Sequence, residues 1–76
     1  MNRLTEAQIG TKYRVFTIQL PQHMVSYYRS AGVYPNAKLT VIAVRGQVVS
    51  VHTSTDFRFG IHNDIAQHII VEEISS

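Results

Sequence analysis

A glycine, a proline and an asparagine crowd together directly before a run of β-branched residues, in the stretch SAGVYPNAKLTVIAV at positions 30–44. Gly32 can adopt the left-handed conformation that closes a helix, and Pro35 presets the first inner position of a tight turn. Asn36 tolerates the positive φ that a type II turn requires at its second inner position. The stretch therefore predicts a helix end, a short linker, a turn and then a strand.

Five segments of the chain have the β-branched and aromatic composition of strands. They cover residues 11–20, 38–45, 48–53, 57–61 and 68–74. In the third, alternation places Val49 and Val51 inward, and in the fourth we expect Phe57, Phe59 and Ile61 to face the core. The second segment is apolar on both faces, which favours a central position in the sheet.

The first of these segments changes parity along its length. Tyr13 and Val15 share one face. The other face carries Phe16, Ile18 and Leu20. A change of this kind is typical of a β-bulge or a barrel corner, where a strand switches the face that it buries.

Helical signals are short and lie outside the strand segments. Residues 22–32 predict one short helix that Gly32 closes, because apolar side chains recur at helical spacing, namely Met24, Tyr28 and Ala31. Asn63 is placed to cap one helical turn over residues 63–67. Near the N-terminus, Thr5 and Gln8 have the spacing of a capping box.

The number of short strands determines the expected architecture. The chain has 76 residues, which predicts one domain over residues 1–76 with a single modest core. It has no cysteine, so neither a disulfide nor a thiolate metal site can stabilise that core. Closure removes exposed strand edges. The sequence therefore predicts a mainly β fold, a small barrel of about five strands with one short helix after the first strand and a helical turn before the last.

Charge and hydropathy argue against nucleic acid and membrane insertion. The pI is about 9.3, but the formal net charge is only +2, and the seven basic residues are scattered along the sequence. A binder of phosphate backbones is expected to carry a stripe of Lys and Arg. No apolar run approaches the roughly 20 residues needed to cross a bilayer, and the first ten residues lack the features of a signal peptide. We expect a cytoplasmic protein.

The order and identity of these segments resemble the FeoA-like family, small cytoplasmic SH3-like barrels associated with bacterial ferrous iron transport. The resemblance lies in LTEAQIGTKYRV at 4–15, YRSAGVYPNAKLTVIAV at 28–44 and FRFGIHNDIAQHIIVEEI at 57–74. The family's middle motif is a leucine-rich helix followed by Leu-Gly-Leu, one residue and Pro-Gly. Its places are taken here by Tyr28, Ala31, Gly32, Val33, Pro35 and Asn36. The resemblance implies an SH3-like barrel.

A divalent transition metal is the first cofactor to consider, given this association with iron. Such metals take imidazole and carboxylate ligands that converge on one point. No two histidines have the i, i+4 spacing of a helical site. His62 and Asp64 can form a local pair that His68 approaches across the helical turn, and these three are the weak metal candidates. Solvated, exposed histidines are the alternative.

Recognition of a partner fits the sequence better than catalysis. Ser54, Thr55 and Asp56 adjoin one another, but turn chemistry explains such a cluster, and we expect no enzyme activity. Aromatic residues and arginine are enriched in protein interfaces. Tyr27, Arg29 and Tyr34 gather around the predicted helix and its exit, and are therefore the candidate partner-binding residues. The alternative is that they only cover the barrel end.

The resemblance implies an accessory or regulatory role in ferrous iron uptake, with the chain docked on the cytoplasmic part of the FeoB ferrous iron transporter. The alternative is a metal-sensing or dimerisation module resembling the C-terminal domain of metal-dependent repressors. That module normally follows a helix-turn-helix domain, so a chain of this length favours the transporter accessory. Self-association stays open, because small cores and barrel edges permit it and no heptad pattern supports it.

Overall fold

The computed structural model describes residues 1–74. In chain order it contains β1 (Asn2–Arg3), the 3₁₀ turn η1 (Leu4–Glu6), β2 (Lys12–Ile18), α1 (Gln22–Ser30), β3 (Lys38–Arg45), β4 (Val48–Thr53), β5 (Arg58–His62), α2 (Asn63–Ala66) and β6 (Ile69–Glu73). The five predicted strands and both predicted helices are present. One further strand, β1, is only two residues long and pairs with β6, which is too short for any sequence pattern to indicate.

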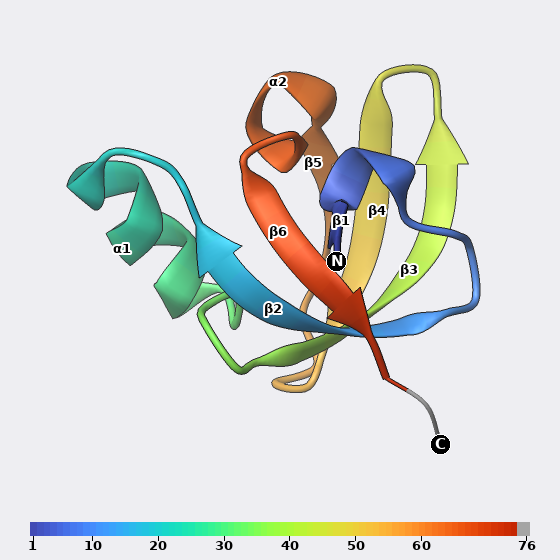
Figure 1. Ribbon diagram of the computed structural model, residues 1–76, viewed down its shortest axis with the longest axis horizontal. Coiled ribbons are helices and arrows are strands. Elements are labelled where there is room, and N and C mark those ends of the chain that lie inside the picture. Colours follow the sequence, from blue (N-terminus) through green and yellow to red (C-terminus); the bar gives the residue numbers. More distant parts are fainter. Residues whose placement is uncertain (75–76) are drawn as a thin grey trace.

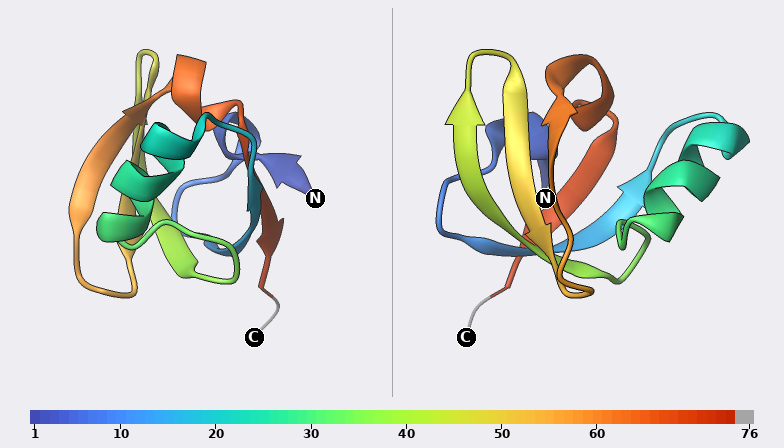
Figure 2. Two further views of the ribbon diagram at one scale, coloured as in Figure 1. Left: turned by 90° about the vertical axis from the view of Figure 1, so that its left-hand side faces the viewer. Right: turned by 180° about the vertical axis from the view of Figure 1, so that it is seen from behind.

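The strands form one antiparallel sheet in the order β1-β6-β2-β3-β4-β5. It curves around its own inner face, and α1 lies beside it between the end of β2 and the start of β3 (Figures 1 and 2). This confirms the small, mainly β fold and the central place of β3. The barrel is not closed, because β1 and β5, at the two ends of the sheet order, do not pair with each other.

The helix ends where the sequence predicts. Gly32 has a φ of +92°, its N–H donates to the Arg29 carbonyl at 3.1 Å, and the Val33 N–H reaches back to the Tyr28 carbonyl at 2.8 Å. These two bonds are those of a Schellman motif, which satisfies carbonyls at the end of a helix. The motif also turns Val33 into the core, where its side chain is fully buried next to Tyr28 in the same cluster.

The predicted turn follows directly. Asn36 has a φ of +77°, and the Ala37 N–H donates to the Tyr34 carbonyl at 2.9 Å. A positive φ at the second inner position and this hydrogen bond identify a type II turn. Its exit leads into β3, and the corner between helix and strand is confirmed.

Two bulges bend the sheet. The β2–β6 register shifts between Val15 and Thr17, and the β3–β4 register shifts between Val41 and Ala43. The first shift is the predicted change of parity in β2. It leaves Phe16 unpaired and 52% exposed, so the expectation that Phe16 shares a buried face is wrong. A bulge increases local twist, which helps one short sheet to enclose a core.

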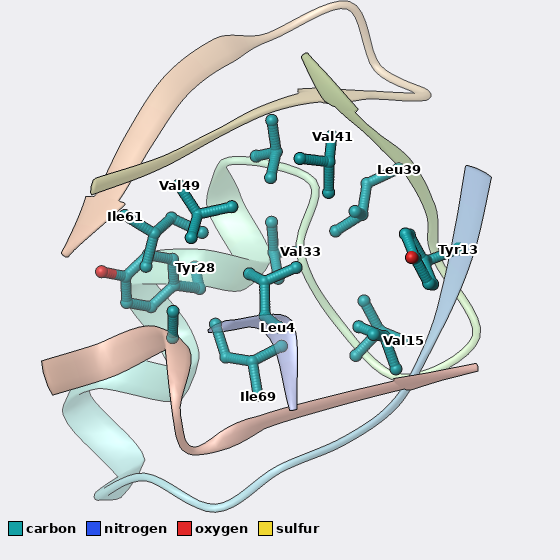
Figure 3. Packing of buried hydrophobic residues seen from close by; sticks show 13 residues of the cluster. Leu4, Tyr13, Val15, Tyr28, Val33, Leu39, Val41, Val49, Ile61 and Ile69 are labelled. Carbon is teal, nitrogen blue, oxygen red and sulfur yellow. The ribbon is translucent and has the colours of Figure 1, made fainter. Parts of the chain in front are cut away.

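The core lies on the concave face of the sheet. Side chains from the strands, from η1 and from α1 point toward one another there (Figure 3), including Leu4, Val15, Tyr28, Val41 and Ile61. Val49 and Val51 face inward as predicted. Fully burying an aliphatic or aromatic side chain contributes about 1.5–3 kcal/mol. Leu4 and Tyr28, which lie outside the strands, therefore tie η1 and α1 firmly to the sheet.

Three local expectations differ from the structure. Phe57 is 51% exposed because β5 begins one residue later, at Arg58. The N-cap of η1 is Arg3, whose backbone N–H donates to the Glu6 carboxylate at 2.9 Å, and the predicted pair of Thr5 and Gln8 does not form this cap. The cap of α2 is likewise one residue earlier than Asn63. For the two helical turns, the spacing indicated the turn correctly and its cap residue wrongly.

The Gly32 corner yields a stability prediction. A Cβ at Gly32 would overlap Thr55 Oγ1 and lie 3.0 Å from Thr53 Oγ1. Gly10 is the matched control, because its φ of +85° is similar and nothing lies within 4 Å of its Cβ position. A left-handed backbone costs an L-residue about 1–2 kcal/mol. We expect Gly10→Ala to lower the free energy of unfolding by about that amount and Gly32→Ala by at least about 1 kcal/mol more, measured by urea denaturation. Equal losses in both variants would contradict the packing of Gly32 against these threonines.

Candidate functional site

The helix and its exit position the predicted partner-binding residues. The Arg29 guanidinium carbon lies 5.9 Å from the centroid of the Tyr34 ring, a cation–π distance. The corner at Gly32 produces this contact by folding the chain back along the last turn of α1. Tyr27 is 68% exposed and touches the Tyr28 ring edge-on, with centroids 5.1 Å apart. Desolvation by burial, followed by the nearby Tyr27, raises the pKa of the Tyr28 hydroxyl.

The three residues do not all face one way. Tyr27 and Arg29 are two positions apart, so their side chains leave the helix about 200° apart around its axis. Residues at that spacing do not face each other on a helix. The structure therefore joins Arg29 to Tyr34 and places Tyr27 on another side of α1. A partner that contacts all three has to wrap around the helix.

His62 and Asp64 lie together, as the sequence suggested, but as a helix cap. The backbone N–H of Asp64 donates to His62 Nδ1 at 3.1 Å, and this bond caps α2. The same Nδ1 is 3.5 Å from the Asp64 carboxylate. An ion pair there requires a protonated ring, which cannot accept the capping bond, so the cap and the ion pair exclude each other. We assign the cap, because its distance is the shorter.

His68 does not complete a metal site with this pair. Within residues 1–74, no three side chains of His, Asp or Glu converge closely enough to hold an ion. His68 lies after α2, where its backbone N–H donates to the Ile65 carbonyl at 2.9 Å. The metal candidates remain a prediction for ligands that a second chain or a partner completes.

A closer pair of polar side chains lies at the β4–β5 turn. His52 lies opposite Arg58, and its Nε2 donates to Asp56 Oδ1 at 2.7 Å. The hydrogen bond and the charge of His52, then that of Arg58, lower the pKa of Asp56. The sequence analysis placed Asp56 in a turn cluster and did not pair it with His52. Their i, i+4 spacing across a turn was the available signal, and Asp56, with a φ of +68°, makes the turn.

This pair borders a cleft on the outer face of the sheet. The cleft has a volume of about 290 Å³ and opens over the first residues of β2 and β3. Its polar lining consists of Lys12, Lys38, Thr40, His52, Thr53, Ser54 and Asp56. Two of these are lysines, from neighbouring strands. Within the described residues, no helix is long and apolar enough to cross a membrane.

Comparison with models of protein families identifies the family of this chain. The FeoA domain model matches residues 2–73, nearly the whole chain. The chain belongs to the FeoA family. A comparison with curated proteins finds no match.

Three solved structures have the fold of this FeoA domain. One is a crystal structure described as an iron uptake regulatory protein (FeoA), with a TM-score of 0.83, 23% identity and 96% of each chain covered. A FeoA protein from Chlorobium tepidum has a TM-score of 0.87 at 19% identity, over 96% of this chain and 70% of that one. A manganese-dependent transcriptional repressor, in complex with manganese, has a TM-score of 0.84 at 24% identity. This domain covers 96% of its own chain there and 36% of the repressor. Together they confirm the small SH3-like fold.

The His52–Asp56 bond predicts a pH dependence. The pKa of Asp56 is lower in the fold than its ordinary value of 3.8, so the pair stabilises the fold above that value. The contribution disappears as the pH falls through the lowered pKa. We expect a ¹³C NMR titration of the Asp56 carboxyl to give a pKa below 3.8 that rises in His52→Ala. His23→Ala, which removes an exposed imidazole on α1, is the control and should leave it unchanged. An Asp56 titration that is identical in His52→Ala contradicts the pairing.

Proposed function

We propose that this FeoA domain is a small accessory or regulatory protein of ferrous iron uptake that docks on the cytoplasmic part of the FeoB ferrous iron transporter. The observation that carries the proposal is the match to the FeoA model over residues 2–73. The solved relative described as an iron uptake regulatory protein supports it. The fold itself is shared by several functions and carries less weight.

The docking surface in this proposal is the α1 surface, defined by Tyr27, Arg29 and Tyr34. Tyrosine and arginine supply much of the binding energy in protein interfaces. The cation–π contact between Arg29 and the Tyr34 ring favours one relative arrangement of the two side chains before any partner binds. Ordering of side chains before binding lowers the entropy that an interface loses on association, at about 0.5–1.5 kcal/mol for each side chain immobilised. Tyr27 presents most of its ring to solvent and is free to enter a partner's pocket.

In this proposal the domain acts by binding one state of the transporter more tightly than another. A bound protein shifts the equilibrium between two states of its partner only by the difference in its affinity for them. The FeoA domain would therefore favour the conformational or nucleotide state of the transporter to which it binds more tightly. No bond is made or broken by this chain in that mechanism.

A second candidate function follows from the likeness to the manganese-dependent repressor. In this alternative the domain acts as a metal-sensing or dimerisation module, with His62, Asp64 and His68 as the metal candidates. The His62–Asp64 pair supports it because the two groups already lie close together. Further ligands would come from a second chain.

The docking proposal predicts which variants weaken binding. We expect Tyr27→Ala, Arg29→Ala and Tyr34→Ala each to weaken the affinity for the purified cytoplasmic domain of FeoB by about tenfold, or about 1.4 kcal/mol, in calorimetric titration. Matched controls are Arg45→Ala, an exposed arginine at the far end of β3, and Ile42→Ala, an exposed apolar residue on the same strand. These controls should bind as the unaltered chain does.

The same variants connect docking to transport. In a strain that lacks this gene, ferrous iron uptake should fall, and only the unaltered chain and the two control variants should restore it. Unimpaired uptake in the deletion strain, or tight binding by all three α1-surface variants, would count against the proposal.

The metal-sensing alternative predicts a localised response to Mn²⁺. Paramagnetic broadening in ¹⁵N NMR spectra should concentrate on the amides around His62 and Asp64. Asp64→Asn should reduce it while keeping the α2 cap, because the Asp64 backbone N–H makes that cap. Asp56→Asn, at the β4–β5 turn, is the matched control. Broadening that is uniform, or equal in both variants, rules out this pair as the site.

A further inference from the structure

Strand pairing gathers cations that are scattered in the sequence. Arg14 of β2 lies directly opposite Lys38 of β3, and Lys12 of β2 lies opposite Thr40, two residues further along β3. Their inward neighbours, such as Tyr13 and Leu39, are buried, so the three cations share the outer face. Diagonal neighbours on one face lie about 7–8 Å apart, so Lys12 is close to Lys38 as well.

This arrangement opposes the stability of the sheet. Like charges directly opposite on neighbouring strands are destabilising. Arg14 has Glu72 at 3.8 Å, but within residues 1–74 no acidic group lies within 4.0 Å of Lys12 or Lys38. When a protein keeps an unfavourable local arrangement, such as like charges opposite each other, without a compensating contact, the residues involved often belong to a functional site. The two unpaired lysines are therefore the notable members of this group.

The same two lysines line the cleft described above: Lys12 is the cross-strand partner of Thr40, and Lys38 lies two residues before Thr40 on β3. The cleft also presents the hydroxyl-bearing side chains of Thr40 and Ser54, which can donate to an anion. Its one acidic residue is Asp56 at the turn. That carboxylate already accepts a hydrogen bond from His52, so its charge is partly satisfied within the protein, unlike the charge of the lysines.

We propose that this lysine cleft, formed by Lys12, Lys38, Thr40, His52, Ser54 and Asp56, binds carboxylate side chains of an acidic peptide segment in a protein partner. Lys12 and Lys38 would each pair with one carboxylate, and the hydroxyl of Thr40, which lies opposite Lys12, would donate to the carboxylate that Lys12 binds. Charge-assisted hydrogen bonds of this kind are about twice as strong as neutral ones. The proposal does not require the partner to be the transporter, because the cleft shares no residue with the α1 surface.

The distribution of charge favours an acidic peptide over nucleic acid. Binding to a phosphate backbone is strengthened by each further cation along a continuous track. Here Asp56 and Glu72 lie among the cations of the outer face, and they interrupt any such track. Separate carboxylates on a flexible peptide can reach the lysines and avoid these acidic residues. Interspersed charges of both signs thus match an acidic peptide segment better than the continuous charge of a phosphate backbone.

The test uses the whole ¹⁵N-labelled chain and a hexaglutamate peptide with blocked ends, followed by NMR titration. The expected result is saturable shifts concentrated on the amides of Thr40, Thr53 and Ser54. Lys12→Gln and Lys38→Gln should each weaken the affinity by about two- to fivefold, since each removes one solvent-exposed ion pair. Arg45→Gln is the matched control, because it neutralises an exposed cation at the opposite end of β3, and it should leave the affinity unchanged.

Several outcomes would overturn the proposal. Shifts spread evenly over the surface, or an affinity that survives both lysine variants, would show that the peptide binds elsewhere. Equal binding of hexaglutamine would show that charge is not needed for binding, and tighter binding of inorganic phosphate or of a dT oligonucleotide would assign the cleft to phosphate.

Thermal unfolding provides an independent check. Lys38→Gln should keep or raise the melting temperature because it relieves repulsion with Arg14, and a lower melting temperature would show that Lys38 has a structural role instead.

Discussion

The close packing of Gly32 against the β4–β5 turn is the contact on which the rest of the fold depends. Only a residue without a Cβ can take a φ of +92° there and lie against Thr53 and Thr55. This contact ends α1, turns Val33 into the core and directs the chain through the Asn36 turn into β3. Because β3 pairs with both β2 and β4, the position of the corner also sets the centre of the sheet.

A single curved sheet encloses the core of this domain, whereas larger domains usually bury their core between two packed layers. Bulges after Val15 and after Val41 supply the curvature, and Leu4 and Tyr28 add core volume from outside the strands. The consequence, within residues 1–74, is an outer face with exposed side chains. Apolar side chains at the bulges, such as Phe16 and Ile42, face solvent as a result. A domain of this construction has little volume for a reaction site and much surface for recognition.

Two surfaces of this FeoA domain suit recognition, and they differ in chemistry. The α1 surface presents aromatic rings and one arginine, which favour a partially apolar partner. The lysine cleft presents two lysines and several hydroxyls, which favour carboxylates. The proposed role of the α1 surface in ferrous iron uptake rests on membership of the FeoA family. The lysine cleft follows from the register of β2 and β3 alone. A regulator that binds through two chemically distinct surfaces can distinguish its partner more sharply than through either one.

The sequence by itself determined the features that depend on neighbouring residues. The helix end at Gly32, the turn at Asn36, the parity change in β2 and the five longer strands follow from local backbone preferences and alternation. They also carried the resemblance to the FeoA family. Tertiary structure alone decided which distant residues meet. Arg14 is set opposite Lys38, and His52 is placed beside the cleft, by the pairing of separate strands. The two-residue strand β1 and the outward turn of Phe57 depend on the same pairing. The register between strands comes from burying all inner faces together, and no short stretch of sequence contains that information.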